Sequence, residues 1–143
     1  MNFLLVFSIL FNYTNLNNEN NKLVGNWESS SKDLRVNVFI KNEKVFAKLI
    51  WFPCTHKVKI PMANHLDTKN PNPKLRSHSW LDLIILSGLQ YDKENKWTNG
   101  QIYNPESGRT YTAYLQLLSQ NKLKVRGYWG FEFIGETLIF NKI

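Results

Sequence analysis

The residue types best suited to chemistry gather within residues 53–82, which hold the single cysteine and all three histidines. Thiolate, imidazole and carboxylate groups are the ligands that zinc prefers. In chain order they are Cys54, His56, His65, Asp67 and His78. Their intervals match no zinc-finger or HExxH spacing. We therefore expect no metal and no cofactor, and a metal site here is the weaker alternative.

A second arrangement in the same segment is Ser77, His78 and Asp82, the residue types of a serine hydrolase. No Gly-x-Ser-x-Gly elbow accompanies them to expose a nucleophile. The sequence thus predicts a protein that is not an enzyme, with a hydrolase in residues 53–82 as the less favoured alternative.

The elements around this segment have the pattern of strands. Apolar residues alternate with polar ones along residues 34–40, as in a half-buried strand, and Asn99-Gly100 and Gly108 are turn signals between aromatic-rich runs. The four prolines in residues 53–79 indicate a long loop of about residues 53–80, with a short helix near residues 73–83. Strands are predicted at residues 23–30, 34–40, 45–52, 83–91, 97–104, 110–119, 122–128 and 133–140. The prediction is an all-β protein, a single antiparallel up-and-down barrel of about eight strands.

Composition limits the partners. A chain of 143 residues forms one domain with a sizeable core, and one cysteine allows no internal disulfide. The net charge of +7 is spread along the chain, which favours solubility. A basic barrel also suits single-stranded nucleic acid. Because Lys122 and Lys124 simply alternate with apolar residues, we expect no nucleic-acid partner.

The N-terminus is predicted to direct export. Residues 3–11 are an apolar run too short to span a bilayer, and an Asn-rich stretch follows at residues 12–21. We interpret residues 1–21 as a signal peptide or hydrophobic leader plus spacer, and residues 22–143 as the domain. A periplasmic or secreted protein without a stable membrane span is expected. No small-x-small cleavage sequence precedes the spacer, so a retained anchor, or a strand or helix packed on the domain, is the alternative.

Four motifs in chain order carry a family resemblance. They are Gly25-Asn26-Trp27; Asp67 with Asn70-Pro71-Asn72-Pro73-x-Leu75-Arg76; Gly100-x-Ile102-Tyr103-Asn104-Pro105-x-x-Gly108-x-x-Tyr111; and Leu123-x-Val125-Arg126-Gly127-Tyr128-x-Gly130. From about residue 23 onwards the chain resembles the bacterial domain of unknown function family 2147. The resemblance implies a lipocalin-like (calycin-like) secreted or periplasmic barrel with no established enzyme activity.

The first motif also resembles the first-strand signature of the lipocalins. In that signature the glycine lets the chain enter the barrel closely, and the tryptophan plugs the closed end. A basic residue from a late strand covers the ring, which suggests barrel closure by Gly25, Trp27 and Arg126.

The predicted binding residues surround a barrel mouth. Asp67 and Arg76 could close the ends of the long loop as an ion pair, or Arg76 could face the head group of a ligand. The interior is expected to be formed or filled by five rings, those of Trp51, Tyr103, Tyr111, Tyr114 and Trp129. The resulting hypothesis is a non-catalytic binder of a small apolar or amphipathic ligand. The alternative is an envelope or secreted interaction scaffold with a filled barrel; the sequence gives no oligomeric state.

Overall fold

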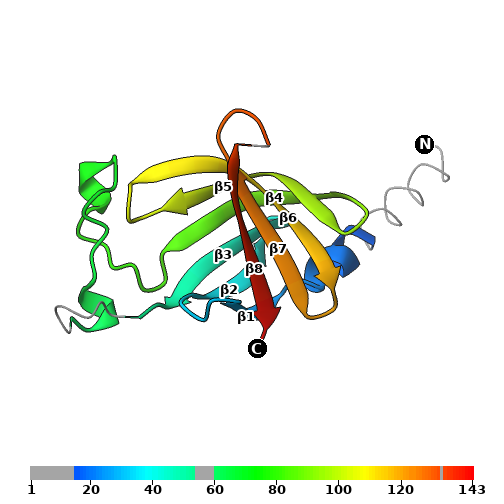
Figure 1. Cartoon of the computed structure of the whole chain (residues 1–143), viewed down its shortest axis with the longest axis horizontal. Coiled ribbons are helices and arrows are strands. Elements are labelled where there is room, and N and C mark those ends of the chain that lie inside the picture. Colours follow the sequence, from blue (N-terminus) through cyan, green and yellow to red (C-terminus); the bar gives the residue numbers. More distant parts are fainter. Residues whose placement is uncertain (1–14, 54–59, 133) are drawn as a thin grey trace, which may run out of the picture.

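Eight antiparallel strands form a closed barrel in which each strand pairs with the next and β8 pairs with β1 (Figure 1). The computed structural model describes residues 15–53, 60–132 and 134–143. The strands are β1 (Gly25–Ser29), β2 (Arg35–Lys41), β3 (Lys44–Trp51), β4 (Ile84–Lys93), β5 (Lys96–Asn104), β6 (Arg109–Ser119), β7 (Lys122–Tyr128) and β8 (Gly135–Lys142). The predicted fold is therefore confirmed, and most strand ends lie within two residues of the prediction.

The barrel has two different ends. The long connection between β3 and β4 lies at one end, which we call the mouth, while a helix over residues 15–21 lies at the other, the closed end (Figure 1). The long connection holds two short 3-10 helices, η1 (Met62–Asn64) and η2 (Pro73–Leu75). The predicted helix near residues 73–83 is thus a single turn. It is started by the Asn72 side chain, which accepts a hydrogen bond from the Lys74 backbone N–H.

Side chains fill the barrel interior. The inward row Gly100, Ala113 and Gly127 lies in register across β5, β6 and β7 and carries almost no side-chain volume. The space it leaves is occupied, because a Cβ on Gly100 would collide with Leu89 and one on Gly127 would lie 2.9 Å from Cγ2 of Ile102. Small residues on one wall therefore make room for large ones from β4 and β5.

The closed end is plugged by two fully buried indoles and a polar clamp. Trp27 donates to the Leu23 carbonyl at 2.8 Å, and Trp97 donates to the Asn20 side chain at 2.9 Å. The amide of Asn20 in turn donates to the Glu43 carbonyl at 3.1 Å, so the helix over residues 15–21 is fixed to the β2–β3 hairpin. This helix lies in the stretch that the sequence suggested was only a spacer. Among the described residues, no helix is long and apolar enough to cross a membrane.

The basic residue that covers Trp27 is Lys142, and the predicted role of Arg126 is wrong. Lys142 is in direct register with Trp27, and its ammonium lies 5.4 Å from the ring centroid. The stem of Lys142 passes over Gly25, where a Cβ would lie 3.3 Å from its Cε. Arg126 instead has its guanidinium on the outer face, near the mouth, because its neighbour Val125 points inward.

Candidate functional site

The long loop is held to the barrel by a buried carboxylate. Asp67 is fully buried, accepts a hydrogen bond from the Tyr103 hydroxyl at 2.7 Å, and accepts another from the Asn70 side chain at 2.8 Å. Burial of the Tyr103 hydroxyl and, as the second cause, its contact with Asp67 raise the pKa of Tyr103 to about 12. Each oxygen of the Asp67 carboxylate, which is shielded from water, therefore accepts a hydrogen bond. The pair thus joins the loop to strand β5.

Further contacts explain the remaining motif residues of the loop. Gly108, with a φ of 73°, lies so close to the Lys69 carbonyl that any Cβ would collide with it. Arg76 donates to the carbonyl of Asn70 at 2.8 Å. The described ion pairs do not include the expected one between Arg76 and Asp67. The Asn-Pro-Asn-Pro block and its partners therefore order the loop in this structure, and their role in ligand binding stays a prediction.

The described residues with catalytic or metal-binding side chains do not come together as one site. The His65 ring packs 4.1 Å from the Trp80 ring, and the Asp82 carboxylate lies 3.7 Å from the Lys48 ammonium. His78 is exposed, and the described hydrogen bonds do not join its side chain to Ser77 or Asp82. No group of three or more potential metal ligands occurs in the described residues. Cys54 and His56 lie outside them.

Three of the five predicted interior rings lie on the outer face. Tyr103 follows the inward-facing Ile102 and therefore points outward, to Asp67. Tyr114 is buried on the outside, with the Lys96 and Lys124 ammonium groups 4.2 Å and 5.5 Å from its ring centroid. The sequence predicts these rings inside because alternation alone does not say which of two adjacent residues faces the core.

Trp51 is the third outward ring, and it belongs to a row that crosses three strands. A bulge between Arg35 and Val36 puts Trp51 in register with Arg35, which is in register with Glu28. The Arg35 guanidinium lies 4.9 Å from the Trp51 ring centroid and is 2.7 Å from the Glu28 carboxylate. Because Trp27 is buried inside the barrel, Glu28 and its row face outward.

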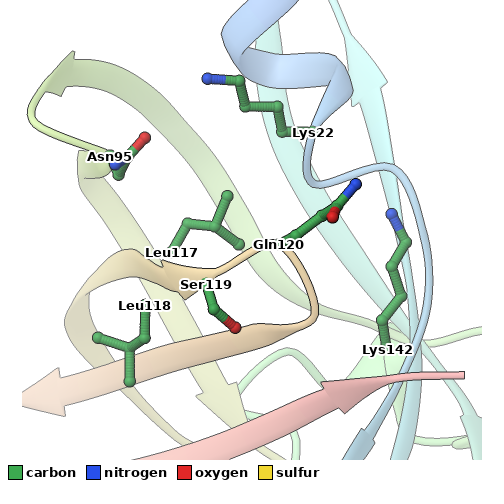
Figure 2. Close-up of a pocket in the computed structure, with 7 residues that line it drawn as sticks. All are labelled: Lys22, Asn95, Leu117, Leu118, Ser119, Gln120 and Lys142. Atoms are coloured by element: carbon green, nitrogen blue, oxygen red, sulfur yellow. The ribbon is translucent and has the colours of Figure 1, made fainter.

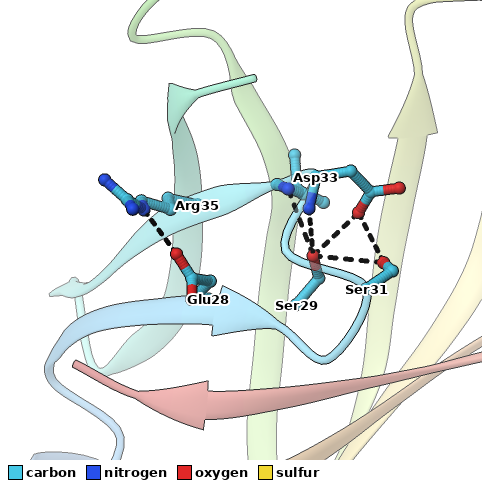
Figure 3. A network of polar contacts seen from close by, with 6 residues as sticks. Glu28, Ser29, Ser31, Asp33 and Arg35 are labelled. Carbon is cyan, nitrogen blue, oxygen red and sulfur yellow. Dashed lines mark hydrogen bonds and ion pairs between the residues drawn. The ribbon is translucent and has the colours of Figure 1, made fainter. Parts of the chain in front are cut away.

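The turn that follows β1, at the mouth, is held by a network of side-chain hydrogen bonds (Figure 3). The buried Ser29 hydroxyl accepts the backbone N–H groups of Asp33 and Leu34, both at 3.1 Å, and donates to the Asp33 carboxylate at 2.8 Å. Ser31 also donates to Asp33, at 2.6 Å. These hydroxyl contacts, that of Ser31 first, lower the pKa of Asp33. These contacts fix the backbone between β1 and β2 at the mouth of the barrel.

Apolar side chains gather at the mouth on the β6–β8 side. The Tyr111 and Trp129 rings are 6.3 Å apart, and the inward-facing Leu138 is 39% exposed. The connection between β7 and β8 adds Phe131 and Ile134; Trp129 and Phe131 are 66% exposed and Ile134 is 53% exposed. We call these five residues the mouth cluster. Tyr111 and Trp129 were predicted as binding residues from the sequence.

The β7–β8 connection that carries most of the cluster is braced. Arg126 donates to the Glu132 carbonyl from Nε and Nη2, at 2.8 and 2.7 Å, and to the Thr137 hydroxyl at 2.8 Å. The backbone N–H of Trp129 also donates to the Ile134 carbonyl. Arg109 lies with its guanidinium carbon 5.9 Å from the Trp129 ring centroid. Within the described residues 129–132 and 134, these contacts hold the backbone that carries the exposed rings.

Sequence reasoning missed Phe131, Ile134 and Arg109 as part of this site. A signal was present, because residues 129–134 connect two strands and yet read Trp-Gly-Phe-Glu-Phe-Ile. Connections of this length are normally polar, so an apolar one indicates a contact surface.

Comparisons with known proteins agree with the geometry. Among solved structures the chain is similar to HP1028 from Helicobacter pylori, described as a protein that belongs to the lipocalin family. The two share 25% sequence identity with a TM-score of 0.71, over 85% of this chain and 82% of that one. No curated protein matches the chain. Residues 25–142 match the model of domain of unknown function 2147, described as an uncharacterized protein conserved in bacteria. The chain belongs to this family, with a lipocalin-like barrel as its fold.

Proposed function

We propose that the protein is a non-enzymatic, exported binding protein that holds a small apolar or amphipathic ligand at the mouth of its barrel. The mouth cluster carries this proposal, because Trp129, Phe131 and Ile134 are each more than half exposed on one ordered turn. Large exposed apolar patches on a soluble domain are typical of contact surfaces. The apolar run at residues 3–11 supports export.

The packed interior sets how deep a ligand can go. Leu89 and Ile102 occupy the space beside Gly100 and Gly127, and Ile102 is in register with Tyr111 of the mouth cluster. A ligand would therefore lie against Tyr111, with its apolar part between the exposed rings, and would not enter the lower barrel. Arg109 stands beside Trp129 and would face an acidic head group, if the ligand has one.

The same packing favours a second candidate function. A filled barrel can act as a scaffold whose mouth cluster docks onto another protein, with no small ligand. The two functions differ in what covers the mouth cluster, a small molecule or another protein. A small molecule would remain bound during purification, whereas a docking surface would leave the protein free of small molecules.

Native mass spectrometry separates them. The full chain is purified from a bacterial host that exports it, its mass is measured, and any bound molecule is extracted after denaturation. A retained lipid or small apolar acid is the expected result. A clean mass would favour the scaffold.

An apolar fluorescent probe, anilinonaphthalene sulfonate, then locates the contact. We expect the double variant Trp129→Ala/Phe131→Ala to bind the probe roughly tenfold or more weakly, since a buried aromatic contributes about 1 to 2 kcal/mol. Ile84→Ala is the control, because Ile84 is 46% exposed on β4 and is not part of the mouth cluster. Equal probe binding by the double variant and the control would contradict a site at the mouth.

A further inference from the structure

Among the described residues, which leave out Lys57 and Lys59 of the long connection, the excess of positive charge lies at the closed end. Every hairpin that turns there has lysines beside its tip, and more come from the ends of the helix and of β8. The described residues of this end include Lys22, Lys41, Lys44, Lys93, Lys96, Lys122, Lys124 and Lys142, against Glu19, Glu43, Asp92 and Glu94. The excess at this end is four positive charges.

The rest of the described chain is nearly neutral. It holds eight basic side chains, Lys32, Arg35, Lys48, Lys69, Lys74, Arg76, Arg109 and Arg126, and seven acidic ones, Glu28, Asp33, Asp67, Asp82, Glu106, Glu132 and Glu136. A charge that served solubility alone would be spread over the surface. An excess at one end is instead typical of a surface that meets a negatively charged partner.

A pocket opens in the middle of this basic end. It has a volume of about 410 Å³ and lies between the helix end and the β6–β7 hairpin. Figure 2 shows Lys22, Gln120 and Lys142 around one side of it, with Leu117 and Leu118 toward the other. The Lys22 ammonium pairs with the Glu19 carboxylate at 2.9 Å, whereas among the described residues no carboxylate pairs with Lys142. Ammonium groups beside leucines suit a ligand that has an anionic head and an apolar stem.

The chain also enters the domain at this end. The helix over residues 15–21 is tied to the closed end through Asn20, and the apolar run of residues 3–11 precedes it in the sequence. Nine residues are too few to span a bilayer. When this run is retained, as in the anchor alternative, it and a basic patch together meet the usual requirement for stable attachment to a membrane surface.

We propose that the closed end docks onto the surface of an anionic phospholipid bilayer. The lysines of the hairpin tips contact the head groups, and the pocket beside Lys22 and Lys142 receives one of them. The mouth cluster then faces away from the bilayer, so this docking is independent of the ligand site proposed above.

Vesicle co-sedimentation with the full chain tests the proposal. The vesicles contain phosphatidylcholine alone or phosphatidylcholine mixed with phosphatidylglycerol. We expect binding to the anionic vesicles that weakens as salt is added. The variant Lys41→Gln/Lys44→Gln/Lys122→Gln should bind them at least tenfold more weakly, because each surface lysine contributes roughly fivefold.

The matched control is Lys32→Gln/Lys69→Gln/Lys74→Gln, which removes the same charge from exposed lysines of the mouth end. It should bind like the unchanged protein. Equal weakening in both variants would mean attraction by net charge alone and would overturn the proposal. Equal binding to neutral and anionic vesicles would overturn it as well, because the apolar run would then account for attachment.

Discussion

Replacing Tyr103 by Phe tests how the long loop is held on the barrel. The substitution removes a 2.7 Å hydrogen bond to Asp67, whose carboxylate is fully buried, and leaves only the contact from Asn70. A hydrogen bond to a charged group contributes about 1.5 to 3 kcal/mol, and a buried acceptor without its donor adds to the loss. We expect a loss of roughly 2 kcal/mol in the free energy of unfolding, or about 5 to 8 °C in Tm for a domain of this size.

The assay combines urea unfolding with limited trypsin digestion. Lys69, Lys74 and Arg76 are exposed loop residues at which trypsin can cut, so faster cleavage there would report a loop that opens. Tyr128→Phe is the control, since the described hydrogen bonds include none from its hydroxyl. If Tyr103→Phe unfolds like the unchanged protein and the loop is cut no faster, then the Asp67 contact does not hold the loop.

Three further changes have defined outcomes. Asn20→Ala leaves the buried indole N–H of Trp97 without an acceptor, and should lower the free energy of unfolding by about 1 to 3 kcal/mol in urea; an unchanged value would argue against the clamp. Raising the pH from 10 to about 12 should lower the free energy of unfolding, because the tyrosine of the unfolded chain ionises near pH 10 while Tyr103 in the folded protein keeps its proton to about pH 12. Tyr103→Phe should remove this contribution, which is measured as the difference between the unfolding curves of the variant and the unchanged protein. Arg126→Ala should speed amide hydrogen exchange in residues 129–134, because the two hydrogen bonds from Arg126 to the Glu132 carbonyl are lost. It should leave the fluorescence of buried Trp27 unchanged, because Lys142 covers that ring. A change in the Trp27 fluorescence without faster exchange would instead indicate that Arg126 covers the ring, as the sequence suggested.

The barrel was predictable because its strands carry local signals. Alternation along residues 34–40 and the turn signal at Gly108 depend on neighbouring residues only, and the structure has a strand and a turn at those places. The turn predicted at Asn99-Gly100 is wrong, because these residues lie inside β5, where the pairing with β6 shifts register. The helix over residues 15–21 was only the alternative interpretation of the N-terminal segment, because its attachment is polar. A single Asn20 contact with Trp97, 77 positions away, leaves no apolar periodicity in the sequence.

The site was predicted only in part because it depends on register. Arg126 and Lys142 are both basic residues of late strands, and only the pairing of Trp27 with Lys142 decides which one covers the ring. The sequence likewise names Tyr103 as a binding residue without showing that Asp67 engages its hydroxyl. Residues that fix a loop and residues that bind a ligand have the same polar and aromatic types, so they cannot be separated without coordinates.

The central claim, an apolar ligand site at the mouth, is tested most directly by tryptophan quenching with a nitroxide-labelled fatty acid. Trp129 lies in the mouth cluster, whereas Trp27 and Trp97 are fully buried toward the closed end. The account predicts saturable quenching of the full chain that is largely lost in Trp129→Phe, a variant that keeps an aromatic ring. Quenching that persists in Trp129→Phe would place the probe beside other indoles and contradict a site at the mouth. No quenching at all would leave the mouth cluster as a surface for docking another protein.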